Sequence, residues 1–167
     1  MNIRILQESD AKKYKELRLN GLKNDPEAFG STYDREVLFS METIIDRIRP
    51  SSDKFVLGAF TDQNELVGIA SFVRESNLKT AHKGNIYGMY VSQENRGRGI
   101  GKLLIHDLIN KVRDCIGLEQ INLAVVSTNE AAKYLYKSNG FETYGIERNA
   151  LKFNNQYFDE DLMTFHL

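Results

Sequence analysis

The chain has 167 residues, 41% hydrophobic and 27% charged, which are proportions of an ordinary soluble globular domain. Its formal net charge of −1 argues against a dedicated nucleic-acid binder, because such proteins carry an excess of basic residues that replaces the counterions around phosphates. The single cysteine, Cys115, cannot form an internal disulfide, and no apolar run approaches transmembrane length. We therefore expect one domain over residues 1–167, located in the cytoplasm, with no nucleic-acid or membrane partner.

The first half of the chain changes from helical to strand-like spacing of its apolar residues near Pro50. Helical periodicity, N-capping side chains and a stop at proline mark the helices, whereas apolar runs around a short polar loop mark a hairpin. The predicted elements are a strand at Asn2–Leu6, a helix from Ser9 and Asp10 to about Lys23, a helix at Met41–Arg49, and strands at Phe55–Phe60 and Leu66–Val73 around the loop Asp62–Glu65.

The second half contains the longest amphipathic helix. Apolar residues recur at four-residue steps from Ile100 to Ile116, and Gly117 is well placed to end the helix. Cys115 falls inside this stretch, so we predict a buried, unreactive thiol. The other predicted elements are a strand at Asn85–Val91, a strand covered on both faces at Ile121–Val126, a short helix from Asn129 to Ser138, and strands at about Glu142–Phe153 and Tyr157–Leu167 around the turn Asn154–Asn155.

This order of elements predicts an α/β or α+β domain built in three layers. The strand, helix and strand between residues 85 and 126 require a right-handed crossover, which favours parallel pairing of the two strands. The hairpins before and after this unit make the sheet mixed. We expect a central sheet of about six to seven strands with helices on both faces.

A glycine-rich segment lies between a predicted strand and the start of the long helix, where free backbone N–H groups and the helix dipole favour an anion. Its residues are Arg96, Gly97, Arg98, Gly99, Ile100, Gly101 and Lys102. A phosphate-bearing ligand is one interpretation, and a glycine-rich turn with solvated arginines is the other. A nucleotide-binding domain is disfavoured, because the dinucleotide pattern needs glycine where Lys102 stands and the P-loop needs glycine where Arg96 stands.

Two sequence patterns allow a more specific interpretation of the chain. The hexad Arg96–Gly101 fits R/Q-x-x-G-x-G/A, and Asn129–Phe141 fits N-x-x-A-x-x-L-Y-x-x-x-G-F. With the surrounding elements in matching order, essentially the whole chain resembles the GNAT superfamily of acyl-CoA-dependent N-acetyltransferases. The resemblance implies the three-layer GNAT fold, with two central strands splayed at the cofactor site. It also implies transfer of an acetyl group from acetyl-CoA to a primary amine by direct attack in a ternary complex.

The resemblance assigns roles to individual residues. Backbone N–H groups of Arg96–Gly101, with Lys102 beside them, would hold the pyrophosphate, and the main chain of Met89, Tyr90 and Val91 would pair with the pantetheine arm. Asn129 would lie against that arm, or simply cap its helix. Tyr136 matches the family's general acid, which protonates the departing thiolate, and its alternative is a tyrosine of the hydrophobic core.

The general base is left open. Some family members carry a glutamate at the start of the strand before the hexad, where this chain has Asn85, which cannot accept a proton. Glu36, Glu75, His82 or an ordered water are the alternatives. No catalytic metal is expected, because the three histidines are isolated from one another and from any acidic cluster with ligand spacing.

The resemblance places the acceptor pocket in the segments 24–36 and 144–152, with Phe29, Tyr33 and Glu36 as lining residues. These residues do not select among small-molecule and protein amines. A non-catalytic acetyl-CoA-binding sensor or structural module is the alternative function. The sequence leaves open whether two copies pair as a homodimer.

Overall fold

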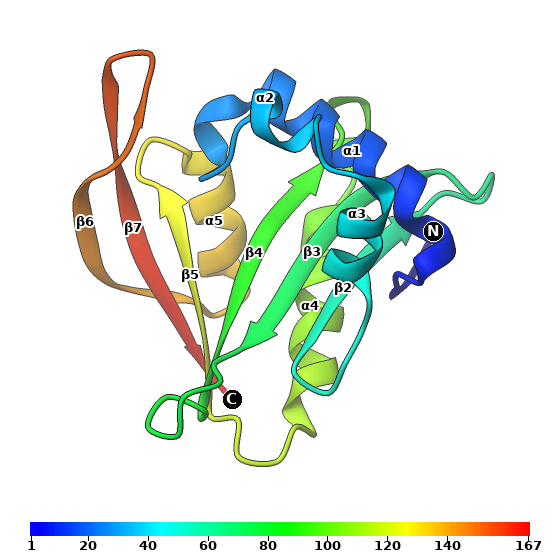
Figure 1. Cartoon of the computed structure of the whole chain (residues 1–167). Coiled ribbons are helices and arrows are strands. Elements are labelled where there is room, and N and C mark those ends of the chain that lie inside the picture. The colour runs from blue at the N-terminus through cyan, green and yellow to red at the C-terminus, as the bar shows by residue number, and fades with distance from the viewer.

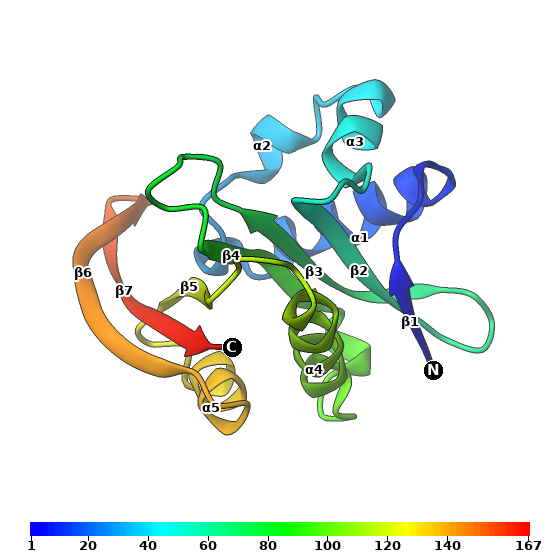
Figure 2. The same ribbon diagram turned by 90° about the horizontal axis from the view of Figure 1, so that it is seen from below.

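The computed structural model describes residues 1–167 and shows a mixed sheet between two layers of helices (Figures 1 and 2), which confirms the predicted fold class. Its seven strands lie in the order β1-β2-β3-β4-β5-β7-β6. All neighbouring strands are antiparallel except β4 and β5. The strands are β1 (Asn2–Ile5), β2 (Lys54–Phe60), β3 (Leu66–Arg74), β4 (Lys83–Val91), β5 (Gln120–Val126), β6 (Glu142–Phe153) and β7 (Gln156–His166).

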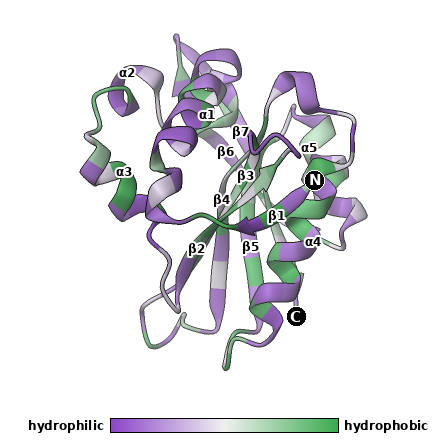
Figure 3. Ribbon diagram, turned by 90° about the vertical axis from the view of Figure 1, so that its right-hand side faces the viewer, coloured by the Kyte–Doolittle hydropathy of each residue, from purple (hydrophilic) through white to green (hydrophobic).

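Helices cover both faces of the sheet, and none is long and apolar enough to cross a membrane. Helices α1 (Ala11–Asn24), α2 (Tyr33–Glu36) and α3 (Met41–Ile48) lie on one face, and α4 (Ile100–Arg113) and α5 (Glu130–Ser138) lie on the other (Figure 2). Each layer has its own buried core against the sheet. Hydrophobic and hydrophilic residues alternate along α4 (Figure 3), as its four-residue apolar spacing predicts.

The predicted length of the long helix is wrong at its C-terminal end. Helix α4 stops at Arg113, where the Cys115 N–H turns back to the Val112 carbonyl at 3.0 Å. Gly117, at φ +76°, then redirects the chain. As a result Ile116 is 94% exposed, and Cys115 is half-buried beyond the helix rather than buried within it.

The two central strands part after a short paired stretch. Strands β4 and β5 are paired only from Lys83 opposite Gln120 to Asn85 opposite Asn122, and beyond this point they diverge (Figure 1). The expectation that β5 is covered on both faces is wrong. Ile121, Leu123 and Val125 are buried against the α4 layer, whereas on the opposite face Val126 is buried and Ala124 is exposed.

Strand β4 contains a bulge close to where it parts from β5. Tyr90 pairs with Ile69 and Tyr87 pairs with Ser71, so Gly88 and Met89 together face a single residue of β3. Gly88 has φ +57°, a left-handed conformation that glycine adopts without strain. The extra residue lets Tyr87 and Tyr90 both face the α1 layer.

Candidate active site

A cavity of about 570 Å³ lies between the diverging ends of β4 and β5. Its walls are the end of β4, the start of α4, helix α5 and the 3-10 turn η2 (Pro26–Ala28). All the predicted site residues except Arg98 line this cavity. They are Met89, Tyr90, Val91, Arg96, Gly97, Gly99, Ile100, Gly101, Lys102, Asn129 and Tyr136.

The backbone at the start of α4 presents a row of free donors. The consecutive N–H groups from Gly97 to Lys102 donate no hydrogen bond within the protein. Gly97 and Gly99 have φ of +74° and +77°, and a Cβ built on either would meet nothing within 4 Å. The segment is therefore shaped by its glycines into an open turn of N–H groups, at the positive end of a helix dipole, and this arrangement binds anions.

The cationic side chains of this segment have different partners. The Arg96 guanidinium pairs with Asp25 at 2.7 Å and also donates to the Val91 carbonyl at 3.1 Å, so it ties the hexad to the end of α1. Arg98 is exposed, contacts Asn95 at 3.4 Å and does not line the cavity. Lys102 has no acidic partner and lines the cavity, so it is the cation best placed to meet an anion there.

The outer edge of β4 faces no strand from Ile86 to Val91, because β5 has already diverged. Main-chain groups on that edge are open to an extended ligand, as the predicted pairing of a pantetheine arm requires. Across the cavity, the Asn129 Oδ1 accepts a bond from the Ala132 N–H at 3.1 Å, so Asn129 caps α5. Its side-chain amide NH₂ has no partner in the protein, and both roles predicted for Asn129 are compatible.

Tyr136 belongs to the core and to the cavity wall at once. Only 6% of it is exposed, and its ring packs edge-on against Phe141 with centroids 5.8 Å apart. Burial raises the pKa of Tyr136 well above its ordinary value. The hydroxyl has no hydrogen-bond partner in the protein, so a buried, protonated phenol borders the cavity.

A second cavity, of about 370 Å³, lies between the α1–α3 layer and strands β2, β3 and β4. The two cavities share no lining residue, but their linings are neighbours in the chain at the bulge, where Gly88 lines the second cavity and Met89 lines the first. No residue of 144–152 lines either cavity, and Tyr33 lines neither. Phe29 lies on the wall of the first cavity, and Glu36 on that of the second.

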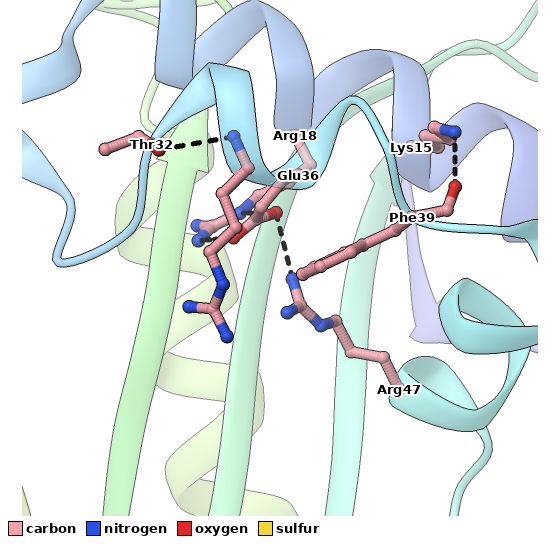
Figure 4. Close-up of polar contacts among 7 residues, drawn as sticks. Lys15, Arg18, Thr32, Glu36, Phe39 and Arg47 are labelled. Atoms are coloured by element: carbon pink, nitrogen blue, oxygen red, sulfur yellow. Dashed lines mark hydrogen bonds and ion pairs between the residues drawn. The ribbon is translucent and has the colours of Figure 1, made fainter.

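Glu36 is held by two arginines from different helices (Figure 4). Arg18 donates to it through Nε at 3.0 Å and Nη2 at 2.9 Å, and Arg47 donates through Nη1 at 2.9 Å. Burial alone would raise the pKa of Glu36, but the two guanidiniums outweigh burial and hold that pKa below its ordinary value. Glu36 is thus a poor proton acceptor, which removes it from the candidate bases.

The other candidate bases lie outside both cavities. The Glu75 carboxylate accepts a bond from the Asn85 amide at 2.6 Å, so a carboxylate does lie beside the position where the resemblance expects one. The backbone carbonyl of His82 accepts the Glu119 N–H at 2.7 Å, and its side chain has no such partner. No group of three or more His, Cys, Asp and Glu side chains is arranged as a metal site.

Among the residues of the second cavity that sequence reasoning missed are Arg18, Arg47, Lys54 and Tyr87. They come from α1, α3, β2 and β4, and only the packing of these elements brings them together. No local spacing in the sequence signals that arrangement.

Comparisons with known proteins agree with this geometry. The family model of the acetyltransferase (GNAT) domain matches residues 3–162. A relative, the uncharacterized N-acetyltransferase YdgE of Bacillus subtilis (strain 168), is 29% identical over 105 residues, which are 63% of this chain and 66% of that protein, just under two thirds of its length.

Solved structures of acetyltransferases share the fold, and two of them illustrate the likeness. An acetyltransferase of the GNAT family from Streptococcus pneumoniae superimposes with a TM-score of 0.88 at 22% identity, over 99% of both chains. The putative acetyltransferase yncA from Salmonella typhimurium, solved with its cofactor acetyl-CoA, gives a TM-score of 0.79 at 21% identity, over 100% of this chain and 94% of the other.

Proposed function

The chain belongs to the GNAT family of acetyltransferases, and from this premise we propose that it transfers an acetyl group from acetyl-CoA to a primary amine. The observation that carries the proposal is the row of free N–H groups from Gly97 to Lys102 on the wall of the cavity. These donors suit a pyrophosphate, and the open edge of β4 beside them suits an extended pantetheine arm. The Salmonella typhimurium relative, solved with acetyl-CoA, supports this assignment.

Acetyl-CoA supplies the acetyl group as a thioester, and the protein has to orient it and manage protons. With the phosphates at the hexad and the arm running back along β4, the acyl end is directed to the bulge, where Met89 lines the first cavity and Gly88 lines the second. The amine then approaches from the second cavity and attacks directly. A bond forms between nitrogen and the acetyl carbon, the carbon–sulfur bond breaks, and the amine loses one proton.

We assign Tyr136 the role of proton donor to the leaving sulfur. Its phenol is buried on the cavity wall, has no competing hydrogen bond, and stays protonated because burial raises its pKa. The amine's proton leaves to water, since Glu36 is occupied by arginines and Glu75 lies outside the cavities, and water then returns one proton to the Tyr136 phenolate.

A non-catalytic acetyl-CoA-binding module is the second candidate. One observation favours it: no carboxylate with a free oxygen lines the second cavity, whose only acidic residue is Glu36. The presence of a second cavity and of Tyr136 favours catalysis.

Two measurements test the proposal. Acetyl-CoA should raise the melting temperature, by the equivalent of about 2.7 kcal/mol at a hundredfold excess over Kd, and NAD and ATP should do much less. Incubation with acetyl-CoA and a broad panel of amines should then release thiol. Equal stabilisation by all three ligands would contradict the assignment of the hexad to CoA, and binding without any thiol release would favour the non-catalytic module.

A further inference from the structure

The side chains that line the second cavity carry more positive than negative charge. Its lining contains four cationic side chains and a single carboxylate, Glu36. The cations are Arg18, Arg35, Arg47 and Lys54. Because Glu36 can balance one of them, the cavity keeps a net positive charge.

Several donors in this cavity have no partner. Glu36 takes Nε and Nη2 of Arg18 and Nη1 of Arg47, which leaves Nη1 of Arg18 and Nη2 of Arg47 free. The Arg35 guanidinium forms no ion pair and lies 5.6 Å from the centre of the Phe39 ring, whose other neighbour is Arg47 at 5.0 Å. Figure 4 shows Arg18, Glu36 and Arg47 converging beneath α2, with the Phe39 ring beside Arg47.

Arg18 and Glu36 are largely removed from solvent, whereas Arg47 is partly exposed. The Arg18 side chain is 11% exposed and that of Arg47 is 33% exposed, against 2% for Glu36. Two guanidiniums facing one carboxylate in such a place favour a second anion, because an unbalanced buried charge is costly. The planar fork of arginine matches the oxygens of a carboxylate and those of a phosphate, and we commit to the carboxylate.

The free donor of Arg18 also lies next to the reaction site. A Cβ built on Gly88 would be 3.2 Å from Nη1 of Arg18, and Gly88 is the bulge residue next to Met89, which lines the first cavity. An anion bound to Arg18 therefore has only a short span to the expected position of the acyl group. The cavity, of about 370 Å³ between the helices and the sheet, fits a small molecule.

We propose that the amine acceptor is a small molecule that carries a carboxylate close to its amine, as an amino acid does, an inference that rests on the proposed function. Arg18 and Arg47 bind this carboxylate. Glu36 holds the two guanidiniums in position. Arg35 adds longer-range attraction at the mouth of the cavity. The amine, at the other end of a short spacer, is then directed to Gly88.

Matched acceptors and a charge-removing variant test this site. The probes are the standard amino acids and their carboxamides, assayed for thiol release with acetyl-CoA and, independently of turnover, for binding by calorimetry in the presence of CoA. Arg47→Gln keeps the pair of Arg18 with Glu36, so the fold should survive. Arg47→Gln should raise KM and Kd for the preferred amino acid by about 10- to 100-fold, with a smaller change in kcat. KM and Kd for the carboxamide should not change.

Three controls make the result decisive. Arg113→Gln removes an exposed arginine at the end of α4, outside both cavities, and should change nothing. Arg35→Gln removes a cation that has no ion pair, so it leaves no buried charge without a partner. It should weaken binding of the amino acid less than Arg47→Gln does. Aminoalkyl phosphonates and acidic peptides test other anions, and a preference for either over the amino acids would overturn the proposal.

The failure of this proposal is distinguishable from failure of the proposed function. Equal turnover of amino acids and carboxamides, unchanged in Arg47→Gln, would overturn the carboxylate site and leave the acetyltransferase intact. If no amine is acetylated, calorimetry decides: amino acid binding that Arg47→Gln abolishes supports the site, and the absence of such binding overturns it.

Discussion

Replacement of Tyr136 by phenylalanine should separate catalysis from folding. The change removes one hydroxyl that has no hydrogen-bond partner in the protein and leaves the ring against Phe141 in place. We therefore expect the free energy of unfolding near neutral pH to change by less than about 1 kcal/mol. The Kd for acetyl-CoA should also be nearly unchanged, because proton donation to sulfur is absent when the cofactor only binds.

The rate should fall. Loss of a general acid typically lowers kcat by about 10²- to 10⁴-fold, and we expect the low end, because a thiol with a pKa of about 8.5 leaves tolerably as an anion. The deficit should shrink as pH rises past that value. The wild-type phenol stays protonated throughout this range, since burial raises the pKa of Tyr136, so the change reports on the leaving group.

The assay is steady-state thiol release by both proteins across pH, with an active acceptor and with chemistry shown to limit turnover. A phenylalanine variant with wild-type kcat would return Tyr136 to a purely structural role. An unchanged kcat with a raised Kd for acetyl-CoA would make the residue a cofactor contact.

Two further predictions concern stability. Burial raises the pKa of Tyr136 in the folded protein. Its contribution to the free energy of unfolding is therefore complete below the pKa of an unfolded tyrosine, about 10, and is lost as the pH rises beyond that value. In urea unfolding at alkaline pH, Tyr136→Phe should therefore become more stable relative to the wild type. A difference in the free energy of unfolding that does not change with pH would refute the burial argument. Glu36→Gln leaves Arg18 and Arg47 without a carboxylate and should cost about 3 kcal/mol, measured by urea unfolding. A cost below about 1 kcal/mol would contradict the buried network. Because the pKa of Glu36 is lowered, its contribution is present above about pH 4.3 and should fade in acid below that value.

The parts of the fold that sequence could predict rest on local patterns. The glycines of the hexad, the Asn129 cap of α5 and the Asn154–Asn155 turn each specify their conformation within a few residues. The apolar spacing of α4 was reliable until Ile116, where a turn that buries Leu118 took over from the helical repeat.

The parts that sequence could not predict depend on partners far along the chain. The bulge at Gly88 is defined by its register against β3, and the splay is defined by where β5 leaves β4. The second cavity requires Arg18, Glu36 and Arg47 to meet from three helices. A Glu at position 36 is ambiguous in sequence, and only its two arginine partners show that it is not a base.

One pair of variants tests most directly the claim that the hexad holds the phosphates of acetyl-CoA. Gly99→Val and Gly117→Val place the same branched residue at nearly the same backbone angle, φ +77° and +76°, so both incur similar strain, about 1–3 kcal/mol. Only Gly99 borders the cavity. By calorimetry with acetyl-CoA, Gly117→Val should keep wild-type affinity and Gly99→Val should lose binding. A folded Gly99→Val protein with unchanged affinity would show that the phosphates bind elsewhere.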